Sequence, residues 1–263
     1  MSSTAINGGI MKRLSLVVVA SMLGLALAMP PMTDVQAAEL KVIAGGSLVP
    51  LFGQLGPQFE KESGHRLSIH FDSTPNIIAQ VTSGTPFDAV VVPIDVFKDA
   101  GTKARFAPDA VDIARVGYGV IVRAGTPKPD LSTPDALKRT LLAAPSIAFV
   151  PASAAGAYIS KVFERLGIAE EMRARVRPQP APVQIAPAVA GGEAALGIFL
   201  MNVLVAPGVE LAGPFPPELQ QELVFTAAVA ADTGEASAAR ALIDYLRTPA
   251  AAAAIKAAGM TPG

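Results

Sequence analysis

Short apolar segments alternate with helix-patterned segments along most of the chain, and this alternation limits the possible folds more than any other feature. Apolar strands of this kind are typical of sheets whose two faces are both covered by helices. The pattern predicts an α/β protein with largely parallel sheets. The predicted strands are Leu40–Ile43, Leu67–Phe71, Ala89–Val92, Val116–Val122, Ser146–Val150 and Leu196–Leu200.

Helix signals fall between these strands. Thr133 followed by Pro134 is a good start, because threonine caps a helix N-terminus and proline suits its first position. Gly167 and Gly259 stand just past two other segments, where glycine commonly ends a helix. The predicted helices are Val49–Ser63, Ile77–Ser83, Pro93–Ala100, Pro134–Leu142, Ala157–Leu166, Ala186–Gly191, Ser237–Leu246 and Pro249–Ala258.

Residues 1–37 have the pattern of a signal peptide. Lys12 and Arg13 form a positive start, an apolar stretch follows over 14–28, and Val35-Gln36-Ala37 places small residues at a cleavage site. We expect a mature chain that begins near Ala38, is free in the bacterial periplasm and has no membrane association after cleavage. A retained anchor is the alternative, and Met11 is a second candidate for the start of translation.

Composition excludes several classes of function. The chain has no Cys and only two His, so it has no disulfides and is a poor candidate for a zinc site; no metal and no cofactor are expected. The formal net charge is −1, which excludes a strongly basic nucleic-acid-binding protein. We expect a monomer.

The run Val42-Ile43-Ala44-Gly45-Gly46-Ser47-Leu48 joins a predicted strand to a predicted helix. The first N–H groups of a helix have no partner within the helix, and the helix dipole is positive there. Glycines let a ligand approach the backbone, and the Ser47 hydroxyl adds a donor. The turn therefore suits an anion. The alternative is an ordinary turn in which Ser47 only caps the helix.

Four stretches, in this order and spacing, carry a resemblance. They are Ala44–Leu48 with Phe59–Gly64; Phe71-Asp72-Ser73-Thr74 with Gly84–Val90; Pro151–Tyr158 with Glu164–Gly167; and Ala241–Pro249 with Gly259-Met260. The chain resembles the periplasmic solute-binding proteins of bacterial ABC importers, in the branch that is similar to molybdate-binding proteins.

The resemblance implies a two-lobed periplasmic-binding-protein fold with the ligand cleft between the lobes. Residues 38–115 and 226–263 are expected to form the first lobe, and residues 116–225 the second. The implied function is the capture of a small anion, either an organic acid or an oxyanion such as molybdate, for an ABC importer whose permease is the partner.

The resemblance also implies which residues bind the ligand. Gly46 and Ser47 match the first contact of the family, and Ser73 and Thr74 match a second. Ala155 and Gly156 match two backbone donors at the start of a helix.

Two departures change the expected ligand. Pro182 stands where the family has a backbone donor and cannot donate, and Leu200 replaces a tyrosine hydroxyl, for which Asn202 is a partial substitute. The Gly45-Gly46 turn is expected to leave more room, and Arg115 is a candidate partner for a carboxylate. These features favour an organic acid over molybdate.

An enzyme on the same scaffold is the alternative reading. The resemblance extends to periplasmic isomerases of aconitate, an unsaturated tricarboxylate, which move a proton and shift a double bond. Such chemistry needs a base beside the bound ligand, and His70 is the best candidate by residue type.

Overall fold

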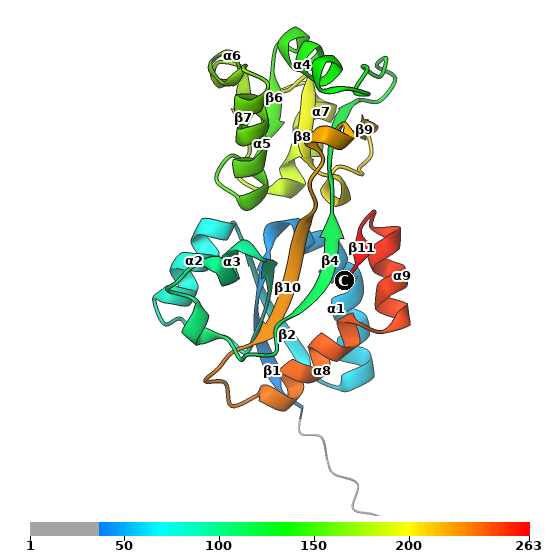
Figure 1. Ribbon diagram of the computed structural model, residues 1–263. Coiled ribbons are helices and arrows are strands. Elements are labelled where there is room, and N and C mark those ends of the chain that lie inside the picture. The colour runs from blue at the N-terminus through cyan, green and yellow to red at the C-terminus, as the bar shows by residue number, and fades with distance from the viewer. Residues whose placement is uncertain (1–36) are drawn as a thin grey trace, which may run out of the picture. The chain divides into compact units, whose positions relative to one another are not determined.

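The computed structural model describes residues 37–263, so the predicted signal peptide lies outside the described residues except for Ala37. Within the described range the chain forms two mixed sheets with helices packed on them (Figure 1). Between residues 37 and 263 we find no helix that combines the length and the apolar character needed to cross a membrane.

The larger sheet has six strands in the order β11-β4-β10-β3-β1-β2. β1 pairs in parallel with β2 and β3, whereas β10 runs antiparallel to β3 and β4. The strands are β1 (Glu39–Gly45), β2 (Arg66–Asp72), β3 (Ala89–Pro93), β4 (Val111–Val116), β10 (Leu223–Val229) and β11 (Thr261–Pro262).

The smaller sheet has five strands in the order β7-β6-β8-β5-β9. β6 is parallel to β7 and β8, and β5 is antiparallel to β8 and β9. The strands are β5 (Tyr118–Arg123), β6 (Ile147–Phe149), β7 (Val176–Pro178), β8 (Leu196–Leu200) and β9 (Val209–Pro214).

Both sheets are mixed, so the expectation of largely parallel sheets is wrong in part. The reason is the path of the chain between the sheets. β10 enters the larger sheet from the cleft end and therefore runs against β1, β2 and β3, which run toward that end. β5 likewise starts at the cleft and runs against β8. Repeated strand–helix units make strands parallel. A strand that arrives from the other lobe enters its sheet from the opposite end and is therefore antiparallel to its neighbours.

Most helices agree with the predicted segments, but the helix predicted over Pro93–Ala100 is shortened to Asp95–Lys98, and the helix Ala169–Arg173 was not predicted. α1 has the predicted bounds, and the Thr133 hydroxyl accepts from the Ala136 N–H at the start of α4. Both α2 and α5 begin three residues earlier than predicted. The bounds are α1 (Val49–Ser63), α2 (Thr74–Thr82), α3 (Asp95–Lys98), α4 (Pro134–Ala143), α5 (Ala154–Arg165), α6 (Ala169–Arg173), α7 (Ile185–Gly191), α8 (Ala236–Leu246) and α9 (Pro249–Ala257).

The strand predicted over 116–122 is in fact two strands in different sheets, β4 and β5, separated at Gly117. The side chain of Gln220, from the returning segment, accepts from the Tyr118 N–H at 2.8 Å and donates to the Tyr118 carbonyl at 2.9 Å. A Cβ at position 117 would lie 3.1 Å from that side chain, which explains the glycine. The division of the chain into lobes at 115/116 and 225/226 stays a prediction.

β3 and β8 are buried along their whole length, and β1 is buried on both faces over Val42–Ala44. In β1, Leu40, Val42 and Ala44 belong to the main core that α1, α8 and α9 cover, while Ile43 points to a second cluster with α2 and α3. This two-sided burial is why β1 and β3 read as apolar runs rather than as alternating segments.

Candidate functional site

A cavity of about 130 Å³ lies between the two sheets, where the carboxyl ends of β1, β2 and β3 meet the segments that follow β6 and β7. Ligands commonly bind at the carboxyl ends of strands in α/β proteins. The cavity is lined by Gly45, Gly46, Ser47, Val49, Phe71, Asp72, Ser73, Thr74, Pro93, Val150, Ser153, Ala154, Ala155, Pro180, Ala181, Pro182, Val183, Phe199, Leu223 and Phe225.

Ser47 lies in a single 3-10 turn, η1 (Gly46–Leu48), that leads into α1. Its side chain caps neither η1 nor α1, and its hydroxyl has no hydrogen bond to another residue in 37–263. The plain N-cap interpretation is therefore wrong. Ser47 is buried and lines the cavity, so its hydroxyl can donate a hydrogen bond to a ligand there.

Asn202 supports Ser47 from the opposite lobe. Its Nδ2 donates to the Ser47 carbonyl at 2.7 Å across the cleft, in a buried hydrogen bond. Asn202 does not line the cavity itself, and its Oδ1 is buried without a partner among residues 37–263. It acts on the cavity through Ser47 rather than as a direct contact.

Ser73 is the N-cap residue of α2, and its hydroxyl makes no capping hydrogen bond. Thr74 is the first residue of the helix. Its Oγ1 accepts from the Ala154 N–H at 3.2 Å, which joins the starts of α2 and α5 across the cleft. Both side chains line the cavity.

The start of α5 forms the opposite wall. The Ser153 hydroxyl accepts from the Gly156 N–H at 2.9 Å and donates to the Val150 carbonyl at 2.8 Å. The Gly156 N–H is thus occupied and Gly156 does not line the cavity, which removes it from the candidate donors. Ala155 does line the cavity, and its N–H has no partner among the described residues.

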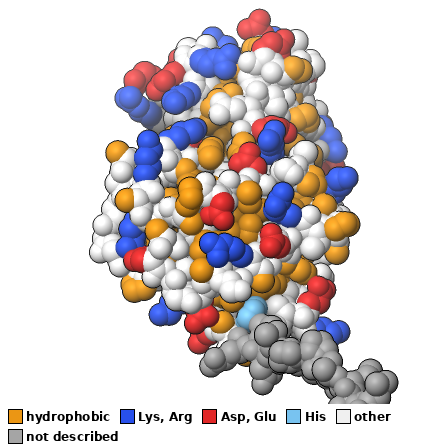
Figure 2. Space-filling model, turned by 60° about the horizontal axis from the view of Figure 1, so that its bottom comes forward, with side chains coloured by type: hydrophobic (Ala, Val, Ile, Leu, Met, Phe, Trp, Pro, Cys, Tyr) orange, Lys and Arg blue, Asp and Glu red, His pale blue; other side chains and the backbone are white. Residues whose placement is uncertain are grey.

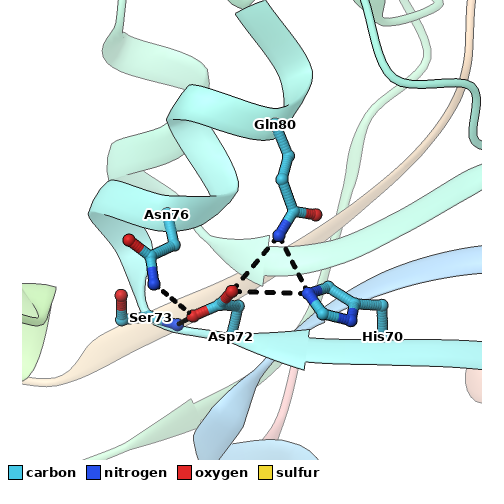
Figure 3. Close-up of polar contacts among 5 residues, drawn as sticks. All are labelled: His70, Asp72, Ser73, Asn76 and Gln80. Atoms are coloured by element: carbon cyan, nitrogen blue, oxygen red, sulfur yellow. Dashed lines mark hydrogen bonds and ion pairs between the residues drawn. The ribbon is translucent and has the colours of Figure 1, made fainter. Parts of the chain in front are cut away.

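Asp72 is the titratable side chain in the lining, and its oxygens are heavily engaged (Figure 3). Oδ1 accepts from the Ser73 N–H at 2.7 Å and from Asn76 at 2.8 Å, and Oδ2 accepts from Gln80 at 3.2 Å. Partial burial raises the pKa of this carboxyl, but the hydrogen bonds from Asn76 and Ser73 and the nearby His70 outweigh it and hold the pKa below its usual value. Asp72 therefore stays ionised near neutral pH.

His70 and Arg115 lie outside the cavity lining. The His70 side chain is 59% exposed, with Nε2 at 3.3 Å from Asp72 Oδ2 and 2.8 Å from the Gln80 amide nitrogen (Figure 3). Arg115 is exposed on β4 and pairs with Asp112 at 3.5 Å. Arg115 is absent from the cavity lining and its guanidinium is engaged by Asp112, so the structure does not place it against a ligand in the cavity.

The expected extra room at Gly45-Gly46 is also absent. A Cβ at Gly45 would lie 3.1 Å from the Phe225 ring and 3.2 Å from Pro93, and a Cβ at Gly46 would lie 3.4 Å from the Pro182 ring. Other side chains fill the space that the glycines leave. The two glycines permit close packing across the cleft rather than a larger ligand.

Sequence reasoning missed Ser153 and the aromatic part of the lining. The Ser153–Gly156 spacing is that of an N-cap and was available as a signal. Phe199 and Phe225 carried no signal, since a buried aromatic side chain in a strand looks like any core residue.

The lining contains no Lys, Arg or His side chain. Figure 2 shows one face of the molecule, on which basic and acidic side chains are intermingled with hydrophobic ones and neither charge dominates. Among residues 37–263 no three His, Asp or Glu side chains are grouped to hold a metal ion. The electrostatic character of the cavity therefore comes from backbone dipoles, hydroxyls and Asp72.

The sequence of this chain is similar to those of known proteins. A family model described as bacterial extracellular solute-binding protein matches residues 40–261. An aconitate isomerase from Pseudomonas sp. is 32% identical over 247 residues, which cover 90% of this chain and 94% of that protein. The molybdate-binding protein of Azotobacter vinelandii is 27% identical and covers 85% of this chain and 90% of its own length.

Solved structures share the fold. The periplasmic molybdate-binding protein of Azotobacter vinelandii superposes with a TM-score of 0.70 at 24% identity, over 84% of this chain and 98% of that chain. The sulfate-binding protein of Mycobacterium tuberculosis H37Rv gives a TM-score of 0.70 at 15% identity, over 86% and 87% of the two chains. The predicted two-lobed α/β fold is confirmed.

Proposed function

Because the chain belongs to the bacterial extracellular solute-binding proteins, we propose that it captures a small organic anion in the cavity between its two sheets. The relatives named above as molybdate-binding and sulfate-binding proteins take small anions, and this chain follows them in the type of site but not in the ligand.

One observation carries the proposal: the starts of three helices line the same small cavity. Ser47 precedes α1, Thr74 opens α2, and Ala155 lies in the first turn of α5. Each helix start carries a partial positive charge, and the Ala155 N–H and the Ser47 hydroxyl have no partner among the described residues. Three such starts around one cavity stabilise a negative ligand without any basic side chain.

The apolar lining of the cavity favours an organic acid. The cavity has a volume of about 130 Å³, close to that of a cavity that accepts one benzene-sized molecule. A tetrahedral oxyanion and one small carboxylate both fit this volume, so the lining decides between them. The apolar side chains of Phe71, Phe199 and Phe225 suit the carbon skeleton of a carboxylate, because burying apolar surface on both sides is favourable.

Delivery to an ABC importer completes the proposal. The signal-peptide pattern of residues 1–37 supports a periplasmic location after cleavage, and a membrane permease is the expected partner. Hydrogen bonds from Asn202 to Ser47 and from Ala154 to Thr74 join the two lobes across the cavity. Opening and closing about the crossing strands would break and remake them.

A thermal-shift screen of the purified protein tests the ligand class. Molybdate, tungstate and sulfate are compared with mono-, di- and tricarboxylates, and stabilisation by carboxylates is expected. Ser47→Ala should weaken binding about tenfold, the effect of losing one hydrogen bond to a charged group. Ser237→Ala, at an exposed position of α8, is the matched control and should bind normally. Stabilisation by molybdate alone would overturn the organic-acid proposal.

A second candidate function is isomerisation of an unsaturated tricarboxylate, which the 32% identity to aconitate isomerase favours. In such a reaction a base removes a proton from one carbon, the double bond shifts, and a proton returns to another carbon. Asp72 is the titratable side chain in the cavity lining, and His70 lies behind it. A carboxylate with a lowered pKa is a weak base, so this geometry favours binding over catalysis.

Incubation with cis- or trans-aconitate, followed by ultraviolet absorbance, separates the two functions. A binding protein leaves the absorbance constant while aconitate raises its melting temperature. Turnover that is lost in Asp72→Asn would establish the isomerase instead. Turnover that survives in Asp72→Asn and is lost in His70→Gln would assign the base to His70.

A further inference from the structure

A second, larger opening adjoins the cavity. Its volume is about 550 Å³, and it shares Thr74, Ser153, Ala154 and Leu223 with the cavity lining. We call it the α2–α5 groove. It is lined by Thr74, Pro75, Ile78, Asp95, Tyr118, Ser153, Ala154, Ala157, Tyr158, Lys161, Gln221 and Leu223.

The groove is formed by one face of α5 and the start of α2. Ala154, Ala157, Tyr158 and Lys161 follow the spacing of residues on a single helix face. Thr74, Pro75 and Ile78 from α2 lie opposite them, and Figure 1 shows α2 and α5 on the same side of the two sheets. The two helices whose first turns line the cavity thus also line the groove, so a ligand can extend from one into the other.

Lys161 supplies the positive side chain that the cavity lacks. None of the ion pairs within residues 37–263 involves Lys161, whereas the acid of the groove, Asp95, is paired with Lys98 at 3.2 Å. The lysine charge is therefore available to a ligand, and the negative charge of Asp95 is partly neutralised.

Tyr118 adds a hydroxyl at the base of the groove. The residue is 1% exposed and its ring packs at a tilt of 39° against that of Tyr158, with centroids 4.8 Å apart. Its hydroxyl has no hydrogen bond to the described residues, while the Tyr158 hydroxyl donates to the Leu219 carbonyl at 2.8 Å. Burial raises the pKa of the Tyr118 phenol, with Tyr158 and Asp95 adding to the effect, so the group stays protonated and can donate.

We propose that the α2–α5 groove is a subsite for a second anionic group of the ligand, which pairs with Lys161 while the first group occupies the cavity. Ala155 and Lys161 are about 9 Å apart along the helix axis. Helical side chains lean toward the N-terminus, which brings the Lys161 ammonium closer to the cavity. This spacing selects a di- or tricarboxylate over a monocarboxylate. The proposal rests on the proposed function, since it assumes an organic anion in the cavity.

Titration calorimetry of the purified protein with tricarballylate, glutarate and butyrate tests the subsite. These probes carry three, two and one carboxylates and have no double bond to isomerise. Lys161→Gln should weaken the binding of tricarballylate and glutarate about fivefold, as expected for a partly exposed ion pair. Lys161→Glu should weaken their binding further. Butyrate should bind with the same affinity to all three proteins.

Lys256→Gln on α9 makes the same change of charge away from both openings and controls for long-range electrostatics. Equal affinity of Lys161→Gln and wild type for all probes would overturn the subsite and leave the proposed function standing. Equal losses in Lys161→Gln and Lys256→Gln would overturn it as well, because only net charge would matter. Failure of every carboxylate to bind wild type would overturn both proposals.

Discussion

The starts of α2 and α5 face each other across the cavity and both have a serine at the N-cap, yet the two serines are used differently. Ser153 accepts from the Gly156 N–H and so completes its own helix. Ser73 makes no such bond. At α2, Pro75 has no N–H to offer, and Asp72 holds the Ser73 N–H, so the local geometry leaves the Ser73 hydroxyl unused.

This difference separates a structural serine from a candidate binding serine that the sequence alone does not distinguish. A hydroxyl that already accepts and donates within the protein has little left for a ligand. A hydroxyl that lines a cavity without a partner is available. The following predictions test this division, from the largest expected effect to the smallest.

Gly156→Ala should cause the largest loss, about 3 kcal/mol of unfolding free energy, because a Cβ at this position would collide with the Val150 carbonyl and lie 2.6 Å from the Pro151 carbonyl. Urea denaturation measures it. Gly191→Ala in α7 is the control, since nothing lies within 4 Å of a Cβ there. Equal stability of the two variants would show that the start of α5 is not closely packed.

Ser73→Ala should weaken ligand binding, whereas Ser153→Ala should lower stability. Ser73→Ala should weaken binding of the best anion from the thermal-shift screen about tenfold, with unfolding free energy nearly unchanged. Ser153→Ala should lower the unfolding free energy by about 1 kcal/mol, because an N-cap is lost. Calorimetry and urea denaturation on both variants check this. If both lost affinity equally, the division between the two serines would fail.

Thr74→Val removes the hydroxyl that joins the two helix starts while keeping the shape of the side chain. The Ala154 N–H loses its partner, and the expected cost is about 1 kcal/mol. Small-angle scattering should show a more open average conformation without ligand than wild type shows. An unchanged scattering profile and unchanged stability would mean that this hydrogen bond does not hold the cleft closed.

The smallest effect concerns pH. The pKa of Asp72 lies below its ordinary value of 3.8 in the folded protein. Its contribution to stability is therefore present above that value and is lost as the pH falls through the folded pKa. Unfolding free energy measured from neutral pH down to about pH 2 should fall less steeply in Asp72→Asn than in wild type. If the two curves of unfolding free energy against pH were parallel, protonation of Asp72 would contribute nothing to the loss of stability in acid.

Local signals were sufficient for most of the secondary structure. α1 begins and ends as predicted, and Thr133 caps α4 through its hydroxyl. Ser47 was singled out from its strand–turn–helix unit, and Ser73, Thr74 and Ala155 from the family resemblance; all four line one cavity. The Ser47 unit is readable because a strand–turn–helix unit depends on residues close in sequence.

What the sequence by itself determined is thus the α/β character, the helix starts that supply anion-binding N–H groups, and the order of the motifs. Only the tertiary structure decided which of these groups are free. Pro182 fills the space beside Gly46, Ser153 occupies the Gly156 N–H, and Arg115 is held on an exposed face. It also placed Lys161 in the α2–α5 groove, which adjoins the cavity. The physical reason is that propensity and capping act over a few residues, whereas space and hydrogen-bond partners at the cleft come from segments that only folding brings together.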